Sequence, residues 1–230
     1  MMNTTTQAGA FSERLYQSSK EIWEQSHRHP FLEELKAGTL DPAKFIYYLK
    51  QDYVYLIDYA KMFAYGSIKA NDLLTMGKFS ELSHSILNVE MGLHRLYAER
   101  FGITREELEN TEPSPTTIAY TKYLLDVAAH GTLAEVAAAI LPCMWSYREI
   151  GVLFAAAPGA LDHALYRDWI LMYSSDEFGE LTDWCIGIMD QLAEGLPEPE
   201  LAKIERHFVM ASKLEYMFWD MAYREEAWPV

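Results

Sequence analysis

Positive charge is scarce in this sequence. Its 230 residues include 19 lysine and arginine residues against 34 aspartate and glutamate residues, which gives a formal net charge of −15. The average field around such a molecule repels phosphate backbones and anionic membrane surfaces. We therefore expect neither nucleic acid nor a membrane as a partner, and we interpret the charge as a solvated acidic surface.

Long apolar runs are also missing from the sequence. No window reaches the ~20 apolar residues that a membrane span requires. The first residues, MMNTTTQAGAFSER, lack both the basic start and the apolar stretch of a secretory signal. We therefore expect a cytoplasmic protein.

Cysteine is rare, and Cys143 and Cys185 are the only two in the chain. In a reducing compartment an isolated cysteine is more often a free thiol than half of a disulfide, and neither residue has the spacing of a zinc ligand. Glycine-rich phosphate loops and Gly-x-Ser-x-Gly elbows are absent. The common motifs for phosphate binding and for serine hydrolysis are therefore excluded.

Helix breakers are few, and apolar residues recur between them at spacings of three and four, with no strand-like alternation of useful length. This pattern predicts about seven helices. Asp41-Pro42 and Ser114-Pro115 are expected to begin two of them, because each pairs a capping side chain with proline at the first helical position. Gly102 and Gly131 are expected to end two.

The second half of the chain has the same helical pattern. Thr132 is expected to cap a helix that is kinked at Pro142, and a further helical region from Ala164 to Ala193 is expected to break at Gly179. The last helix is expected from Pro199 to Glu226.

The chain contains no internal repeat, low-complexity tract or long linker. We therefore expect one helical domain over residues 1–230, with residues 1–10 flexible. Helices of this length hide their apolar faces by packing side by side, and they form ligand sites from side chains that project between them. The predicted fold class is an all-α bundle.

Aromatic residues are abundant, with 15 tyrosines and 6 tryptophans, and Asp52 lies within an aromatic stripe, YYLKQDYVYL. Asp52 and Tyr55 share one face of the expected helix, flanked by Tyr48 and Tyr59. The carboxylate is either satisfied by tyrosine hydroxyls or a neighbouring cation, or it is aimed at the N–H groups of a ligand. Both interpretations stay open at this point.

Cys143 and Tyr147 lie four residues apart in LPCMWSY, on one helical face beside the carbonyl that Pro142 leaves without its helical partner. A free cysteine is commonly a small core residue, and the alternative is a nucleophile. We assign Cys185 to the core.

Glu215 lies within a cluster formed by Tyr216, Phe218, Trp219 and Tyr223. Desolvation there would raise the pKa of Glu215 toward neutrality, as a group that both gives and takes protons requires. The alternative is a carboxylate that escapes to the rim of the cluster.

A di-iron centre in a helical bundle uses paired Glu-x-x-His elements. Glu81 and His84 form one such element, but no second exists, and Glu90 and His94 have a different spacing. We therefore expect no metal and no other cofactor. His29 and His207 are interpreted as structural or surface residues.

Six motifs occur in an order that resembles the thiaminase II (TenA) family across nearly the whole chain. They are HPF at His29, YYLKQDYVYL around Asp52, PSPTTIAYT ending near Tyr120, LPCMWSY around Cys143, WILMYSSDEF around Tyr173, and LEYMFWDMAYREEAW around Glu215. The resemblance implies the heme-oxygenase-like helical bundle and a tetramer of identical chains.

The same resemblance implies roles for individual residues. Cys143 would be the nucleophile and Glu215 the general acid and base, while Asp52 would pair with the amino group and ring nitrogen of an aminopyrimidine. The remaining roles fall on tyrosines: Tyr55 and Tyr120 would hydrogen-bond near Glu215 and the thiol, and Tyr147 and Tyr173 would line the pocket. Where relatives often have aromatics, this chain has Met144, Ser146, Lys213 and Leu214, which bear on substrate preference.

The implied activity is hydrolysis of 4-amino-5-aminomethyl-2-methylpyrimidine to the hydroxymethylpyrimidine and ammonia, together with cleavage of thiamin to the same pyrimidine and the thiazole alcohol. Two alternatives remain open from the sequence. One is a metal- or haem-dependent oxidase of the same fold. The other is a non-catalytic or regulatory protein that binds a thiamin pyrimidine.

Overall fold

The protein is built from helices over residues 10–230, which a computed structural model describes with the exception of the Leu93 side chain. The α-helices are α1 Phe11–His27, α2 Pro30–Ala37, α3 Pro42–Lys69, α4 Leu73–Ser85, α5 Met91–Arg100, α6 Arg105–Glu109, α7 Pro115–His130, α8 Leu133–Ala155, α9 Arg167–Tyr173, α10 Asp176–Ala193 and α11 Glu198–Arg224. A π-helical turn, η1 Ile86–Glu90, joins α4 to α5, and a 3-10 turn, η2 Ala160–Asp162, precedes α9. No strand occurs in this part of the chain, which confirms the all-α prediction. Of the segment expected to be flexible, residues 1–9 lie outside the described residues.

The predicted helix ends are largely confirmed. The side chain of Asp41 accepts a hydrogen bond from the Ala43 N–H at the start of α3, and Ser114 caps α7 in the same way. Thr132 caps α8. Gly102 follows α5 with φ of +73°, a left-handed conformation that only glycine adopts without strain.

The helices outnumber the seven expected because several expected helices are divided. The region from Ala164 to Ala193 is interrupted at Ser174 and Ser175, where Ser175 caps α10, and the predicted break at Gly179 is wrong. Gly179 lies inside α10, where a Cβ would come within 2.6 Å of the Arg148 guanidinium. The glycine therefore permits a close approach between α10 and α8.

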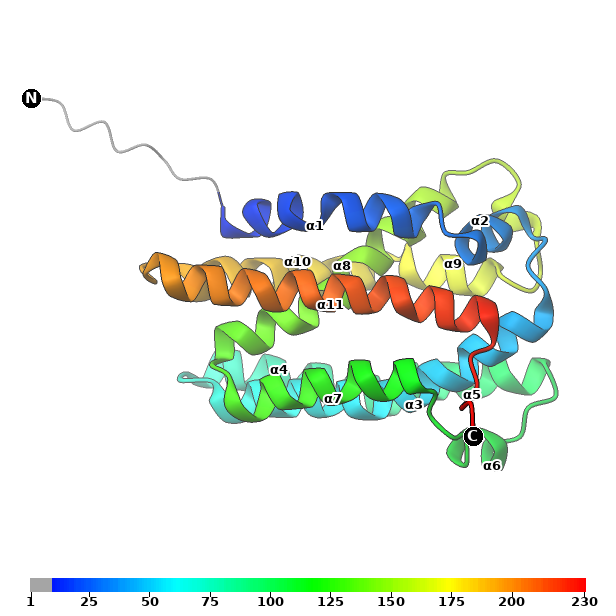
Figure 1. Cartoon of the computed structure of the whole chain (residues 1–230), viewed down its shortest axis with the longest axis horizontal. Coiled ribbons are helices and arrows are strands. Elements are labelled where there is room, and N and C mark those ends of the chain that lie inside the picture. Colours follow the sequence, from blue (N-terminus) through cyan, green and yellow to red (C-terminus); the bar gives the residue numbers. More distant parts are fainter. Residues whose placement is uncertain (1–9) are drawn as a thin grey trace, which may run out of the picture.

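Helix α8 is the centre of the bundle. In Figure 1 it runs obliquely between a group formed by α1, α10 and α11 and a group formed by α3, α4 and α7. It packs against α3, α7, α9, α10 and α11. Side chains from these helices converge on the midpoint of α8, where Cys143 lies.

The prediction that no segment is long and apolar enough to cross a membrane is wrong for α8, which passes that test by length and composition alone. Of its most apolar window, 67% is buried inside the protein. Near its start Glu135 is buried and bonded to Lys203. These are the features of a core helix.

Candidate active site

A small cavity lies beside the middle of α8. It is lined by Asp52, Tyr55, Leu56, Tyr59, Glu90, Cys143, Met144, Tyr147, Tyr173 and Phe178. Its volume is about 20 Å³, which is small beside the ~150 Å³ of an apolar cavity that takes up a benzene ring. An aromatic ring needs more space, so its binding requires side chains of the cavity wall to move.

Five of the seven residues that the sequence singled out line this cavity: Asp52, Tyr55, Cys143, Tyr147 and Tyr173. The other two, Tyr120 and Glu215, form a buried pair directly behind it, in which the Tyr120 hydroxyl donates to Oε1 of Glu215. The Tyr120 ring lies 5.0 Å from the Tyr55 ring, between centroids. The structure thus brings together residues from α3, α7, α8, α9 and α11.

Cys143 is partly exposed, and it is a free thiol. Burial and, next, the charge of Glu215 raise the pKa of this thiol well above its ordinary value. The sulfur is therefore protonated at neutral pH, and a reaction as a thiolate needs a base nearby. Cys185 is buried in the apolar core, as predicted.

Glu215 is 3% exposed, so the alternative in which its carboxylate reaches the rim is wrong. Burial raises the pKa of Glu215 to about 8, against the hydrogen bond from Tyr120, and the charge of Asp52 adds to the rise. A carboxyl group with this pKa exchanges a proton readily near neutral pH.

Asp52 is paired with a histidine that the sequence analysis missed. Nε2 of His94 on α5 lies 2.5 Å from Oδ2 of Asp52 on α3, and the Tyr48 hydroxyl lies 3.5 Å from the same oxygen. Burial alone would lower the pKa of His94, but the hydrogen bond and charge of Asp52 outweigh it and raise that pKa. Oδ1 of Asp52 accepts no hydrogen bond from the described part of the chain. One carboxylate oxygen is thus held by a cation while the other is left for a ligand.

The signal that could have found His94 is its spacing from Glu90. The two residues lie four apart and therefore share a helical face, and Nδ1 of His94 donates to the Glu90 carbonyl at 3.1 Å. Sequence reasoning weighed this pair only as metal ligands.

The tyrosines of the cavity wall differ in how their polar atoms are satisfied. The Tyr55 hydroxyl is fully enclosed and has no hydrogen-bond partner among residues 10–230. The Tyr147 and Tyr173 rings meet edge to face, with centroids 4.7 Å apart. This contact depends on Gly151, because a Cβ there would lie 2.5 Å from the carbonyl carbon of Tyr173.

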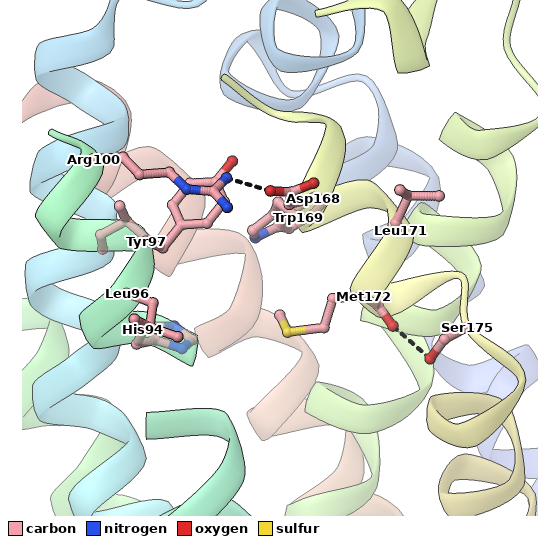
Figure 2. Close-up of a pocket in the computed structure, with 10 residues that line it drawn as sticks. His94, Leu96, Tyr97, Arg100, Asp168, Trp169, Leu171, Met172 and Ser175 are labelled. Atoms are coloured by element: carbon pink, nitrogen blue, oxygen red, sulfur yellow. Dashed lines mark hydrogen bonds and ion pairs between the residues drawn. The ribbon is translucent and has the colours of Figure 1, made fainter. Parts of the chain in front are cut away.

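A larger and more open groove lies beside the cavity, between α5 and α9 (Figure 2). Its volume is about 450 Å³, and most of its lining is apolar. An ion pair between Arg100 and Asp168 joins α5 to α9 at one end of the groove. His94 lines the groove and also contacts Asp52, so its ring separates the groove from the cavity.

The other histidines that the sequence analysis singled out do not line the cavity. Over residues 10–230 no three His, Cys, Asp or Glu side chains are grouped as metal ligands would be. Glu81 and His84 are exposed on α4. The His29 ring caps α2, and His207 bonds Tyr123 and Glu135, which confirms their structural interpretation.

An all-α bundle with a thiol, carboxyl groups and tyrosines around one enclosed cavity defines a helical protein with a site for a small polar molecule. The chain belongs to the TENA/THI-4/PQQC family, whose model matches residues 16–225.

Individual relatives cover nearly the whole chain. An aminopyrimidine aminohydrolase of Halalkalibacterium halodurans is 53% identical over 219 residues, which are 95% of this chain and 98% of the relative. The structure of a TenA homologue from P. horikoshii OT3 matches with a TM-score of 0.86 at 31% identity, over 94% of this chain and 99% of that one. A Shewanella denitrificans domain described as having a heme oxygenase-like fold matches with a TM-score of 0.76 at 17% identity, over 93% and 92% of the two chains. The predicted fold class is therefore confirmed.

Proposed function

We propose that this protein is an aminopyrimidine aminohydrolase of the thiaminase II type. It hydrolyses 4-amino-5-aminomethyl-2-methylpyrimidine to the hydroxymethylpyrimidine and ammonia, and it cleaves thiamin at the same carbon. The observation that carries the proposal is the enclosed cavity in which Cys143 lies next to the Tyr120–Glu215 pair and across from a half-satisfied Asp52. The name of the 53% identical relative supports the same activity.

Asp52 binds the edge of the pyrimidine. Its oxygen Oδ1 accepts from the ring's amino group and from a protonated ring nitrogen, while Oδ2 stays on His94. The rings of Tyr147 and Tyr173 form an aromatic wall for the flat substrate. The unpartnered hydroxyl of Tyr55 supplies one further polar contact inside the cavity.

The chemical step is a covalent addition. The Cys143 thiol gives its proton to the Glu215 carboxylate, and the sulfur bonds to the ring carbon next to a ring nitrogen, which takes up that proton from Glu215. The electrons of the adduct then expel the leaving nitrogen from the attached methylene, with the bonding pair going to nitrogen. Water adds to the methylene carbon and gives a proton to the Glu215 carboxylate. The carbon–sulfur bond then breaks with its electron pair going to sulfur, Glu215 protonates the resulting thiolate, and the ring nitrogen releases its proton to solvent.

The assembly that the resemblance implies, a homotetramer, is part of this proposal, and so is a cytoplasmic location. Ile68, Leu73 and Leu74 are strongly exposed apolar side chains at the junction of α3 and α4, and they support self-association. Sedimentation of the purified protein measures the number of chains directly. A monomer at micromolar concentration would contradict the assembly but not the activity.

The test of the activity is ammonia release from the aminomethyl pyrimidine by protein dialysed against a chelator, beside Cys143→Ser. We expect turnover by the parent and none by the variant, whose helical circular dichroism stays unchanged. Binding without turnover by the parent would favour a binding protein instead. Activity that disappears on chelation and returns with iron would favour a metal enzyme.

A further inference from the structure

Glu90 is a carboxyl group of the cavity that the proposed mechanism does not use. It is the last residue of η1, and it lines the cavity together with Asp52 and Cys143. Its backbone carbonyl accepts from His94, but its carboxylate has no hydrogen-bond partner within residues 10–230. The group is therefore held at the cavity without being satisfied by the protein that surrounds it.

The π-helical turn explains why Glu90 points inward. Such a turn contains one residue more than an α-helical turn, and π turns are frequent at functional sites. One extra residue rotates everything after it by roughly 100° around the helix axis. In this chain Glu90 ends the π turn and lines the cavity, and His94, four residues further along, contacts Asp52.

The charges around Glu90 leave it without a cation of its own. The groups that face it are Asp52 on α3, His94 on α5, Cys143 on α8 and Tyr173 on α9. His94 is the only cation among them, and it is committed to Asp52. Burial raises the pKa of Glu90 to about 7, His94 lowers it and Asp52 raises it. A bound cation would lower the pKa of Glu90 and so favour its ionised form.

We propose that the Glu90 carboxylate binds the protonated amine of the substrate, so that the site selects pyrimidines whose methylene carbon carries a primary ammonium group. The proposal rests on the proposed function. The aminomethyl group is attached next to the ring's amino group, which Asp52 binds, and Glu90 lies on the Asp52 side of the cavity. The carbon–nitrogen bond breaks with its electron pair going to nitrogen, and ammonia leaves without a proton from Glu90. Glu90 therefore binds and orients the leaving group and takes no part in proton transfer.

Two ligands that differ only at this group test the proposal. Calorimetry on Cys143→Ser, which binds without turnover, compares the aminomethyl pyrimidine with the uncharged hydroxymethyl pyrimidine. Adding Glu90→Gln removes the negative charge at constant shape. We expect affinity for the amine to fall roughly ten- to hundredfold, the usual loss for a hydrogen bond to a charged group. Affinity for the hydroxymethyl ligand should change less than about threefold.

The matched control is Glu99→Gln on the same Cys143→Ser background, since Glu99 is exposed on α5. It should leave both affinities unchanged. An equal loss for both ligands in Glu90→Gln would show a structural role and overturn the proposal, and so would no loss for either. If Cys143→Ser bound neither pyrimidine, the proposed function itself would fail.

Discussion

Nε2 of His94 lies 2.5 Å from Oδ2 of Asp52, and both side chains are almost fully buried. The pair joins two helices, because Asp52 belongs to α3 and His94 to α5. It fixes the direction of the carboxylate that we assign to the pyrimidine edge, and it offsets the negative charge within the bundle.

Removing one partner of this pair should strongly destabilise the fold. His94→Ala leaves Asp52 buried and uncompensated, and we expect the free energy of unfolding in urea to fall by about 3–5 kcal/mol. The exposed His84→Ala on α4 is the control, with a change within about 0.5 kcal/mol. The double variant with Asp52→Ala and His94→Ala should lose less unfolding free energy than the two single variants lose together. Additive losses would mean that the two residues are not coupled.

Cys143→Ser should lower kcat by roughly a thousandfold or more, since residues that carry a covalent step cause losses of this order. The melting temperature should stay close to that of the parent. Cys185→Ala, in the core beside α8, controls for the loss of a thiol and should retain turnover per folded molecule. Comparable rates for the parent and Cys143→Ser would exclude the covalent mechanism.

Glu215→Gln should abolish activity and stabilise the fold, and the gain in stability should depend on pH. Burial raises the pKa of Glu215 to about 8, so the folded state favours the protonated carboxyl. The stability that the protonated Glu215 carboxyl contributes to the fold is fully present below the unfolded pKa of about 4.5, and it is lost as the pH rises toward 8. Relative to the parent, the free energy of unfolding of the inactive variant should rise with pH, by up to ~1.4 kcal/mol per pH unit between about pH 4.5 and 8. Above pH 8 the difference should stay constant. Thermal unfolding from pH 5 to 9 measures the difference, and a constant offset would refute the assignment.

Tyr55→Phe should lower kcat/KM by about tenfold without any loss of stability. The enclosed Tyr55 hydroxyl has no partner among the described residues, so its removal leaves no hydrogen bond broken. Tyr59→Phe is the matched comparison, because the Tyr59 hydroxyl donates to the Ile140 carbonyl at 3.0 Å. Its loss should cost about 1 kcal/mol in chemical unfolding. Equal stability losses in the two variants would contradict this account.

Local chemistry is what made the sequence informative. Asp41, Ser114 and Thr132 act on backbone groups two or three residues away, so the helix starts could be predicted from the sequence. The apolar neighbours of Glu215 on its own helix made burial one of two open interpretations, and burial is the one that the structure has. The resemblance, rather than spacing, grouped Cys143 with residues on other helices.

What the sequence did not reveal depends on contacts between distant segments. Asp52 and His94 are 42 positions apart, and no local pattern indicates which histidine meets which carboxylate. The π-helical turn before α5 changes the periodicity by a single residue, which apolar spacing does not resolve. Gly179 resembled a helix breaker because the approach of Arg148 from α8 is invisible in the sequence.

The small volume of the cavity makes gating part of the kinetics of this protein. A cavity of about 20 Å³ does not accept a pyrimidine until its wall opens. Association is therefore slower than diffusional encounter, and the apparent affinity is the affinity of the open state multiplied by the fraction of molecules that are open. Products leave the cavity when its wall opens in the same way. A substitution that eases the opening would raise the association and dissociation rates together, and it would speed turnover wherever product release is the slowest step.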